Sequence, residues 1–222
     1  MANLNLNGNI SKNEETLQLA YTDLITFGKL FSPQDYLASS TPDFHRDVGK
    51  LLIDKSKQQL ALVLPRDHAK STMAACAVLH RFLFATKENP EFIAWIGEAQ
   101  DQARDNLNWI QNHIYSNPAI HYYFGDLEGD KWTKDEFTLK NGCRMIGKGT
   151  SQRLRGKKQN STRYTGIILD DFESELNTKT PDSRRQIKEW VTAAVYPAID
   201  FDKDGFLWCN GTIVHYDSFL NG

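Results

Sequence analysis

The chain has 222 residues, of which 40% are hydrophobic, so it can bury the core of one large domain or of two small ones. Its formal net charge of −2 excludes an overall basic field, so any contact with nucleic acid has to be local. Three cysteines without a C-x-x-C pair favour a reducing compartment. No apolar run approaches the roughly 20 residues that span a bilayer, so we expect no membrane partner.

The first part of the chain is predicted to be a polar tail followed by helices. Residues 1–13 are rich in asparagine and are expected to form a flexible tail rather than a targeting peptide. Apolar residues at helical spacing predict a helix from about 14 to 30, and a second helix from Pro42 toward Ile53 with Pro42 in its first turn. We therefore expect residues 14–58 to form an N-terminal helical segment.

Strands and helices then alternate. The continuous apolar run Leu60–Leu64 predicts a buried parallel strand, and residues 71–84 predict a helix that is apolar all round and hence buried. Residues 92–96 predict the next strand, and apolar residues at helical spacing from Ala99 to Ile114 predict the next helix. This alternation favours a doubly wound α/β fold with a mostly parallel central sheet flanked by helices.

The later part of the chain adds a hairpin and two more strands. Glu136–Lys140 and Cys143–Ile146 flank Asn141-Gly142, which predicts a β-hairpin. Residues 148–163 are expected to form a polar, basic loop. The remaining elements expected are a strand over 166–169, a helix over 181–199 and a strand over 206–209.

A phosphate-binding loop is predicted where the first strand of this alternation meets its first helix. Residues 60–72 read as an apolar strand, a short polar turn and then Lys70-Ser71-Thr72 at the start of a helix. Backbone N–H groups at a helix N-terminus bind phosphate oxygens, a lysine reaches the β- and γ-phosphates, and a hydroxyl binds Mg²⁺. The pattern G-x-x-x-x-G-K-[ST] is matched only in part, because its two glycines would fall at Leu64 and Ala69.

Acidic residues at the end of a later strand complement this loop. Tyr164–Glu173 is an apolar strand that runs into Asp170 and Asp171. Ligands of open α/β sheets bind at the carboxyl ends of strands, where one Asp can hold Mg²⁺ and a second acid can polarise the attacking water. Alone, the segment could equally be an acidic turn that caps the next helix. Together with the loop upstream, it favours a phosphate-binding ATPase or kinase.

The charged residues of the loop have simpler explanations as well. Lys70 could be a solvated residue of a first helical turn, but a cation there opposes the helix dipole, which favours a bound anion. Arg66 could be a surface charge, or it could stabilise the charge on the transferring γ-phosphoryl group. His68 is expected to be a loop residue, and the other histidines show no spacing typical of metal ligands.

Three segments, taken together, resemble the ATPase domain of the large terminase subunit, the DNA-packaging motor of tailed bacteriophages. They are Pro65–Thr72, Ile167–Glu173 and Cys209–Asp217, and they occur in the family's order. The resemblance covers about residues 30 to 222. It implies a P-loop NTPase of the additional-strand, RecA-like (ASCE) class, with residues 59–222 as the ATPase core and with ATP and Mg²⁺ as ligands.

The resemblance also implies roles for individual residues. The family's loop has the form [P/S]-R-x-x-[A/G]-K-[S/T], in which Lys70 is the phosphate-binding lysine and Ser71 the Mg²⁺-binding hydroxyl. Asp170 falls on the Mg²⁺-binding acid, and the catalytic Glu that usually follows is replaced by Asp171, with Glu173 as its rival. The other residues implied to bind nucleotide are Pro65, Arg66, Asp67, His68, Ala69 and Thr72 of the loop, and Asn210 and Thr212 of the coupling motif. An Asn-Gly turn is the simpler alternative for this last motif.

The resemblance implies two further assignments. Phe31, Tyr36 and Phe44 stand where the family holds the adenine, although packing in the core is the simpler explanation for each. Motors of this family act as rings in which a neighbouring subunit can supply an arginine finger, and Arg155, in the basic loop, is the candidate for it. The alternatives for Arg155 are a solvated loop or a contact with DNA phosphates.

The implied partners are double-stranded DNA, the portal protein, the small terminase subunit and further copies of the chain. During packaging the copies would form a homo-oligomeric ring, a pentamer, at the procapsid portal in the host cytoplasm. In isolation the chain would be a monomer. No second spaced set of acids is present for the family's C-terminal nuclease domain, so we expect that domain and its activity to be absent. The alternatives are a helicase-like ATPase, a kinase, or a non-catalytic nucleotide-binding assembly module, which Asp171 in place of Glu keeps open.

Overall fold

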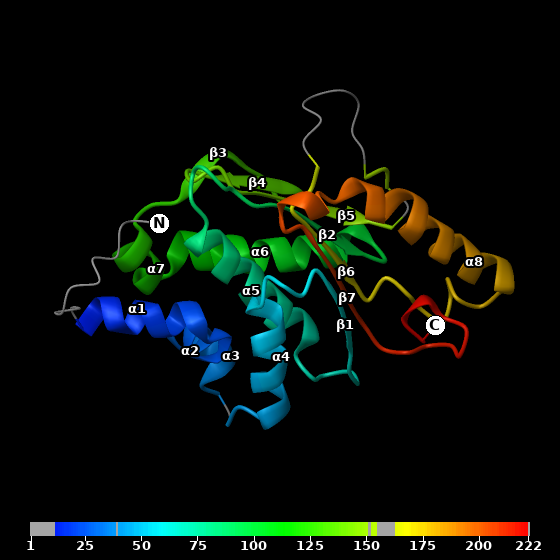
Figure 1. The fold of residues 1–222 in the computed structure, drawn as a ribbon, viewed down its shortest axis with the longest axis horizontal. Coiled ribbons are helices and arrows are strands. Elements are labelled where there is room, and N and C mark those ends of the chain that lie inside the picture. The colour runs from blue at the N-terminus through cyan, green and yellow to red at the C-terminus, as the bar shows by residue number, and fades with distance from the viewer. Residues whose placement is uncertain (1–11, 39, 151, 155–162, 222) are drawn as a thin grey trace.

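The computed structural model describes residues 12–38, 40–150, 152–154 and 163–221, which form one sheet with helices on both faces (Figure 1). The strands are β1 (Gln59–Val63), β2 (Phe92–Gly97), β3 (Glu128–Trp132), β4 (Glu136–Leu139), β5 (Arg144–Gly149), β6 (Gly166–Asp170) and β7 (Phe206–Gly211). The helices are α1 (Lys12–Thr22), α2 (Leu24–Phe31), α3 (Pro33–Tyr36), α4 (Asp43–Ile53), α5 (Lys70–Phe84), α6 (Gln100–Ser116), α7 (Pro118–Phe124) and α8 (Pro181–Trp190). Short helical turns follow at Val191–Val195, Tyr196–Ala198, Phe201–Lys203 and Phe219–Asn221.

The strand order confirms the predicted fold class. The sheet runs β1-β7-β6-β2-β5-β4-β3, in which the first five strands are parallel and β4 pairs antiparallel with β5 and with β3. The last strand of the chain, β7, therefore lies between β1 and β6. It is an additional strand between the strand that precedes the predicted phosphate loop and the strand that carries the acids.

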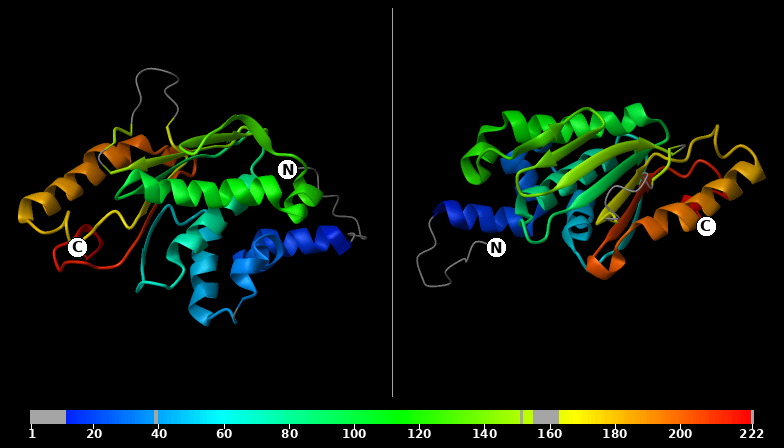
Figure 2. Two further views of the ribbon diagram at one scale, coloured as in Figure 1. Left: turned by 180° about the vertical axis from the view of Figure 1, so that it is seen from behind. Right: turned by 90° about the horizontal axis from the view of Figure 1, so that it is seen from above.

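Two apolar clusters cover the two faces of the sheet. On one face Trp95 and Trp208 pack with α5, α6 and the N-terminal helices. On the other face Leu169 packs with α8 and with Val195 of the turn that follows it. Figure 2 shows the sheet between α6 and α8 in the view from above. Because β2, β6 and β7 are covered on both faces, they are apolar at nearly every position, as parallel strands of this kind are.

The N-terminal helices belong to the larger of these two clusters. Phe27 and Phe31 of α2 pack at ring-centroid distances of 5.0 Å from His80 and 5.8 Å from Phe124. Burial lowers the pKa of His80 to about 4, so this histidine is a neutral part of the core near pH 7. Among the described residues, no helix is both long and apolar enough to cross a membrane.

The structure corrects the prediction of one helix from 14 to 30. Asp23 has an extended backbone and accepts a hydrogen bond from the N–H of Thr26 at 2.9 Å, so a new helix, α2, begins after it. An aspartate that caps a helix in this way ends the preceding helix as well, although the apolar spacing continues through it. Pro42 precedes α4 as its N-cap residue rather than lying within its first turn.

The predicted strand over Leu60–Leu64 is parallel but not buried. It is β1, at the edge of the sheet, and Gln59 and Ala61 are exposed. An edge strand has one open side, which the apolar composition of the run does not reveal. The hairpin prediction is confirmed, with Gly142 at φ 90° in the turn between β4 and β5. The sequence did not reveal β3 or α7.

A close approach at Gly166 supplies a test of the packing. A Cβ atom at Gly166 would lie 2.2 Å from Cζ of Phe206, a fully buried ring, whereas a Cβ at Gly147 would meet Leu107 at 3.3 Å. We expect Gly166→Ala to lower the free energy of unfolding by about 1–3 kcal/mol through overpacking. Gly147→Ala should cost clearly less. Urea unfolding measures both, and equal losses would contradict the close contact.

Candidate functional site

The loop between β1 and α5 leaves a helix N-terminus free of side-chain caps. Ala69, the N-cap residue of α5, has φ 55° and makes no capping hydrogen bond through its side chain. Asp67 is also left-handed, with φ 63°. The first N–H groups of a helix have no partner within the helix, so here they are available to an anion. The left-handed conformation at Ala69 is the one that the glycine of the common phosphate-loop pattern supplies.

A cavity of about 910 Å³ opens over this helix N-terminus. The residues that line it come from the loop and the start of α5, from the end of β2 and α6, from the loop after β6 and from the segment after β7. They are Arg66, Asp67, His68, Ala69, Lys70, Ser71, Thr72, Glu98, Gln102, Asp171, Glu173, Ser174, Glu175, Leu176, Thr212 and Val214. The volume is in the range of ordinary small-molecule sites.

Lys70 is buried at the head of α5. Its Nζ donates hydrogen bonds to the backbone carbonyls of Leu64 and Pro65, at 3.0 and 2.9 Å. The side chain is thus folded back onto the loop that it follows. A phosphate oxygen would be a stronger, charged acceptor than these neutral carbonyls, so an anion in the cavity could take over the ammonium group.

Ser71 and Asp170 meet next to the cavity. The Ser71 hydroxyl donates to Oδ1 of Asp170 at 2.9 Å, and Nδ2 of Asn210 donates to the same oxygen at 3.3 Å. Nδ2 of Asn106 lies 3.5 Å from the other oxygen, Oδ2. The sequence predicted that Ser71 and Asp170 would lie opposite each other. The parallel register of β6 and β7 adds Asn210, which is paired with Asp170.

The environment of Asp170 disfavours its charge. Burial, together with the neighbouring charge of Asp171, raises the pKa of this carboxyl to about 6, although the hydrogen bond from Ser71 opposes the shift. A divalent cation bound by Asp170 would remove the penalty by pairing with the carboxylate. The hydroxyl and the carboxylate are hard oxygen ligands of the kind that Mg²⁺ prefers. No group of three or more His, Cys, Asp or Glu residues suited to a metal occurs among the described residues.

The two acids predicted to act on water differ in how they are held. Asp171 is exposed, lines the cavity and has φ 45°, a left-handed conformation that turns the chain sharply at the end of β6. Glu173 is buried, and its two oxygens accept the backbone N–H groups of Phe219 at 2.6 Å and Leu220 at 3.0 Å. Glu173 therefore fastens the end of the described chain, and both of its oxygens are engaged.

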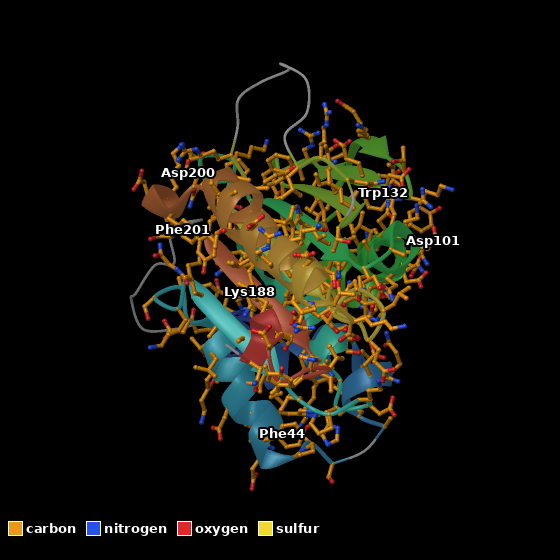
Figure 3. All side chains as sticks on the ribbon, turned by 90° about the vertical axis from the view of Figure 1, so that its right-hand side faces the viewer. Phe44, Asp101, Trp132, Lys188, Asp200 and Phe201 are labelled. Carbon is orange, nitrogen blue, oxygen red and sulfur yellow. The ribbon has the colours of Figure 1, made fainter. Side chains whose placement is uncertain are left out.

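The predicted adenine-stacking residues do not lie together. Phe31 and Tyr36 are buried in the core, and Tyr36 packs on the backbone of Gly28, so neither presents a ring face to a ligand. Phe44 differs, because it is 37% exposed and its ring centroid lies 5.8 Å from that of His68 in the phosphate loop. Figure 3 shows Phe44 on α4, at the opposite end of the view from Trp132. The structure thus leaves Phe44 as the one accessible aromatic of the three.

The remaining predicted site residues differ in whether they bind other residues of the site. Arg66 is exposed and forms no ion pair with the described residues. The Thr212 hydroxyl donates to the carbonyl of Leu64 at 3.1 Å, which ties the segment after β7 to the phosphate loop. Pro65 and Thr72 lie in the loop and the first turn of α5. Arg155 lies outside the described residues.

The sequence reasoning missed Glu98, which lines the cavity at the end of β2. A signal was present, because Glu98 is a polar residue shortly after a buried parallel strand, as Asp171 is. The prediction that strands 92–96 and 166–169 belong to one parallel sheet would have placed their carboxyl ends at one edge.

Comparison with known proteins identifies the fold. No protein-family model and no curated protein matches the chain. Among solved structures it is similar to the large terminase of bacteriophage HK97, with a TM-score of 0.60 and 15% identity over 95% of this chain and 40% of that one. The chain has the fold of a large terminase ATPase domain. It is also similar to a variant of the large terminase ATPase domain of Thermus phage P74-26, with a TM-score of 0.52 and 13% identity over 82% of this chain and 69% of that one.

The left-handed N-cap of α5 leads to a prediction about the missing glycine. A non-glycine residue in this conformation costs about 1–2 kcal/mol. We expect Ala69→Gly to raise the free energy of unfolding by up to about 1 kcal/mol, because the gain exceeds the added freedom of the unfolded chain. Ala75→Gly, in the right-handed interior of the same helix, should have the opposite sign. Urea unfolding of the two variants measures the contrast, and a loss of stability in both would refute it.

The raised pKa of Asp170 leads to a prediction about pH. The native state binds this proton more tightly than the unfolded chain does, so the contribution of Asp170 to stability falls as the pH rises from about 4 through about 6. The loss is at most about 3 kcal/mol. Asp170→Asn should remove this dependence and be more stable than wild type at pH 8 without divalent metal. Parallel stability curves from pH 4 to 8 would contradict the prediction.

Proposed function

We propose that this chain is the ATP-hydrolysing motor domain of a viral large terminase subunit, which drives double-stranded DNA into a procapsid. The observation that carries the proposal is the contact between Ser71, at the uncapped start of α5, and Asp170, at the end of β6, within a terminase-like fold. The chain spans two fifths of the HK97 protein, so the activity and partners of a complete terminase are part of this proposal.

The proposed roles rest on the positions of the residues in and beside the cavity wall. Lys70, Arg66 and the first N–H groups of α5 would neutralise the phosphates of ATP. Ser71 and Asp170 would hold Mg²⁺, which supplies charge neutralisation to the transferring phosphoryl group. Asn210 touches Asp170, and Thr212 touches the phosphate loop, so this pair would sense a ligand bound there. Asp171 stays the family-based prediction for the acid that acts on water.

The proposed partners are those of a packaging motor. They are double-stranded DNA, the portal protein, the small terminase subunit and further copies of the chain in a pentameric ring at the procapsid portal in the host cytoplasm. Within such a ring, we propose Arg155 as the arginine finger that one copy supplies to the next. Nuclease activity is not proposed for these residues.

Two observations keep a second candidate function open. The residue after Asp170 is an aspartate rather than a glutamate, and the carboxylate of Glu173 is engaged by the backbone. Both fit a non-catalytic module that binds nucleotide and assembles with partners. Nucleotide binding without turnover, with or without DNA, would favour this candidate. Turnover that requires a small-molecule acceptor would favour a kinase, and strand separation would favour a helicase.

Substitution of the loop lysine tests the motor proposal. Lys70→Ala removes the buried cation from the cavity, so we expect ATP hydrolysis to fall by at least about 100-fold. The matched control is Lys87→Ala, an exposed lysine beyond the other end of α5, which should hydrolyse ATP at the wild-type rate. Phosphate release with Mg²⁺ and ATP, with and without double-stranded DNA, measures the effect. Full activity of a folded Lys70→Ala protein would overturn the proposal.

A further inference from the structure

Five carboxylates line the cavity, and they differ in their surroundings. They are Asp67, Glu98, Asp171, Glu173 and Glu175. Asp67, Asp171 and Glu175 are exposed, and their side chains accept no hydrogen bond from the described residues, so nothing in that part of the chain orients them. Glu173 has both oxygens bound to backbone N–H groups. An acid that activates water needs a fixed orientation and a free acceptor oxygen, and none of these four has both.

Glu98 has both properties. Its Oε1 accepts a hydrogen bond from the Ser174 hydroxyl at 2.5 Å, and Nδ2 of Asn177 lies 3.5 Å from the same atom. Its Oε2 accepts no hydrogen bond from the described residues. The residue is half-buried in the cavity wall. One oxygen therefore fixes the carboxylate, and the other is left to accept a hydrogen bond from a ligand.

The sheet register places Glu98 beside the acids of β6. Gly97, the last residue of β2, lies opposite Asp170, the last residue of β6. Glu98 is therefore level with Asp171 on the neighbouring strand. Its side chain is one methylene longer than that of Asp171 and can reach further from the edge of the sheet toward a phosphate held at the start of α5.

The turn that holds Glu98 is itself braced. Asn177 accepts a hydrogen bond from the backbone N–H of Ser174 and donates one to the carbonyl of Phe172, both at 2.8 Å. Phe172 is fully buried between the sheet and the C-terminal turn. Ser174 and Asn177 are therefore positioning residues, and they link the orientation of Glu98 to the loop that follows Asp170 and Asp171.

We propose that Glu98 is the catalytic carboxylate that orients and deprotonates the attacking water during ATP hydrolysis, an inference that rests on the function proposed above. The water oxygen forms a bond to the γ-phosphorus, and the bond from this phosphorus to the bridging oxygen breaks. ADP leaves with the electron pair of that bond, and the water proton passes to Oε2 of Glu98 and then to solvent. Asp171 then serves to add negative charge beside Asp170 rather than to take the proton.

The test compares Glu98→Gln with Asp171→Asn and Glu173→Gln in the full chain. Glutamine can still accept the hydrogen bond from Ser174, so the fold and the affinity for a fluorescent ATP analogue should be unchanged. It cannot take the proton, so we expect kcat to fall by roughly 100-fold or more. Asp171→Asn should have a much smaller effect on kcat. Glu173→Gln should lower the unfolding temperature, because it weakens the two bonds to Phe219 and Leu220.

The outcomes separate the role of Glu98 from the proposed function. Wild-type protein that hydrolyses ATP, with Glu98→Gln equally active, would overturn the role of Glu98 alone. The role of Glu98 is also overturned if Glu98→Gln loses nucleotide affinity and thermal stability in step with kcat, because Glu98 would then only hold the turn. Wild-type protein that does not bind ATP, or binds it without turnover at any DNA concentration, would overturn the ATPase proposal and the role of Glu98 with it.

Discussion

The parallel register of three central strands is the constraint on which the candidate site depends. β6 lies between β2 and β7, and Asp170 is paired with Gly97 on one side and with Asn210 on the other. The carboxyl ends of the three strands therefore lie level with one another. The carboxyl end of β1 lies at the same level, because Val63 is paired with Gly211 of β7. This register brings Leu64 and Thr212, which are 148 positions apart in the sequence, within hydrogen-bond distance of each other.

Several groups near the carboxyl ends of these strands lower the stability of the folded state. Asp170 is a buried acid whose charge is disfavoured, and Lys70 is a buried ammonium satisfied by backbone carbonyls alone among the described residues. Three of the four non-glycine residues with positive φ in the described chain, Asp67, Ala69 and Asp171, also line this cavity. Strain and desolvated charge persist only where the surrounding structure imposes them, and they gather at functional sites. The two packed faces of the sheet supply the stability that offsets them.

The sequence predicted those parts of the molecule that depend on local pattern. The apolar runs of β2, β6 and β7 and the all-round apolar α5 were recognisable because burial on both sides leaves no polar face. The end of a helix at Asp23 and the exposed side of β1 were not recognisable from the apolar spacing. The first depends on a hydrogen bond from the Asp23 side chain, and the second on the absence of a neighbouring strand. The burial of Phe31 and Tyr36 was not predictable for a similar reason. The sequence does not distinguish an aromatic ring that faces the core from one that faces the cavity.

The segment after β7 shows why the site and the end of the described chain form one structure. Thr212 donates a hydrogen bond to the carbonyl of Leu64 at the start of the loop before α5, and Glu173, in the cavity wall, accepts the N–H groups of Phe219 and Leu220. Asp217 pairs with Arg184 and Lys188 of α8, the latter labelled in Figure 3, and these cations lower the pKa of its carboxyl to about 2. Residues 212–221 are thus fastened to the loop, the acidic turn and α8 at once. A ligand that displaces any of these three elements must strain or break a bond to residues 212–221. Binding in the cavity is therefore expected to alter the conformation of this segment first.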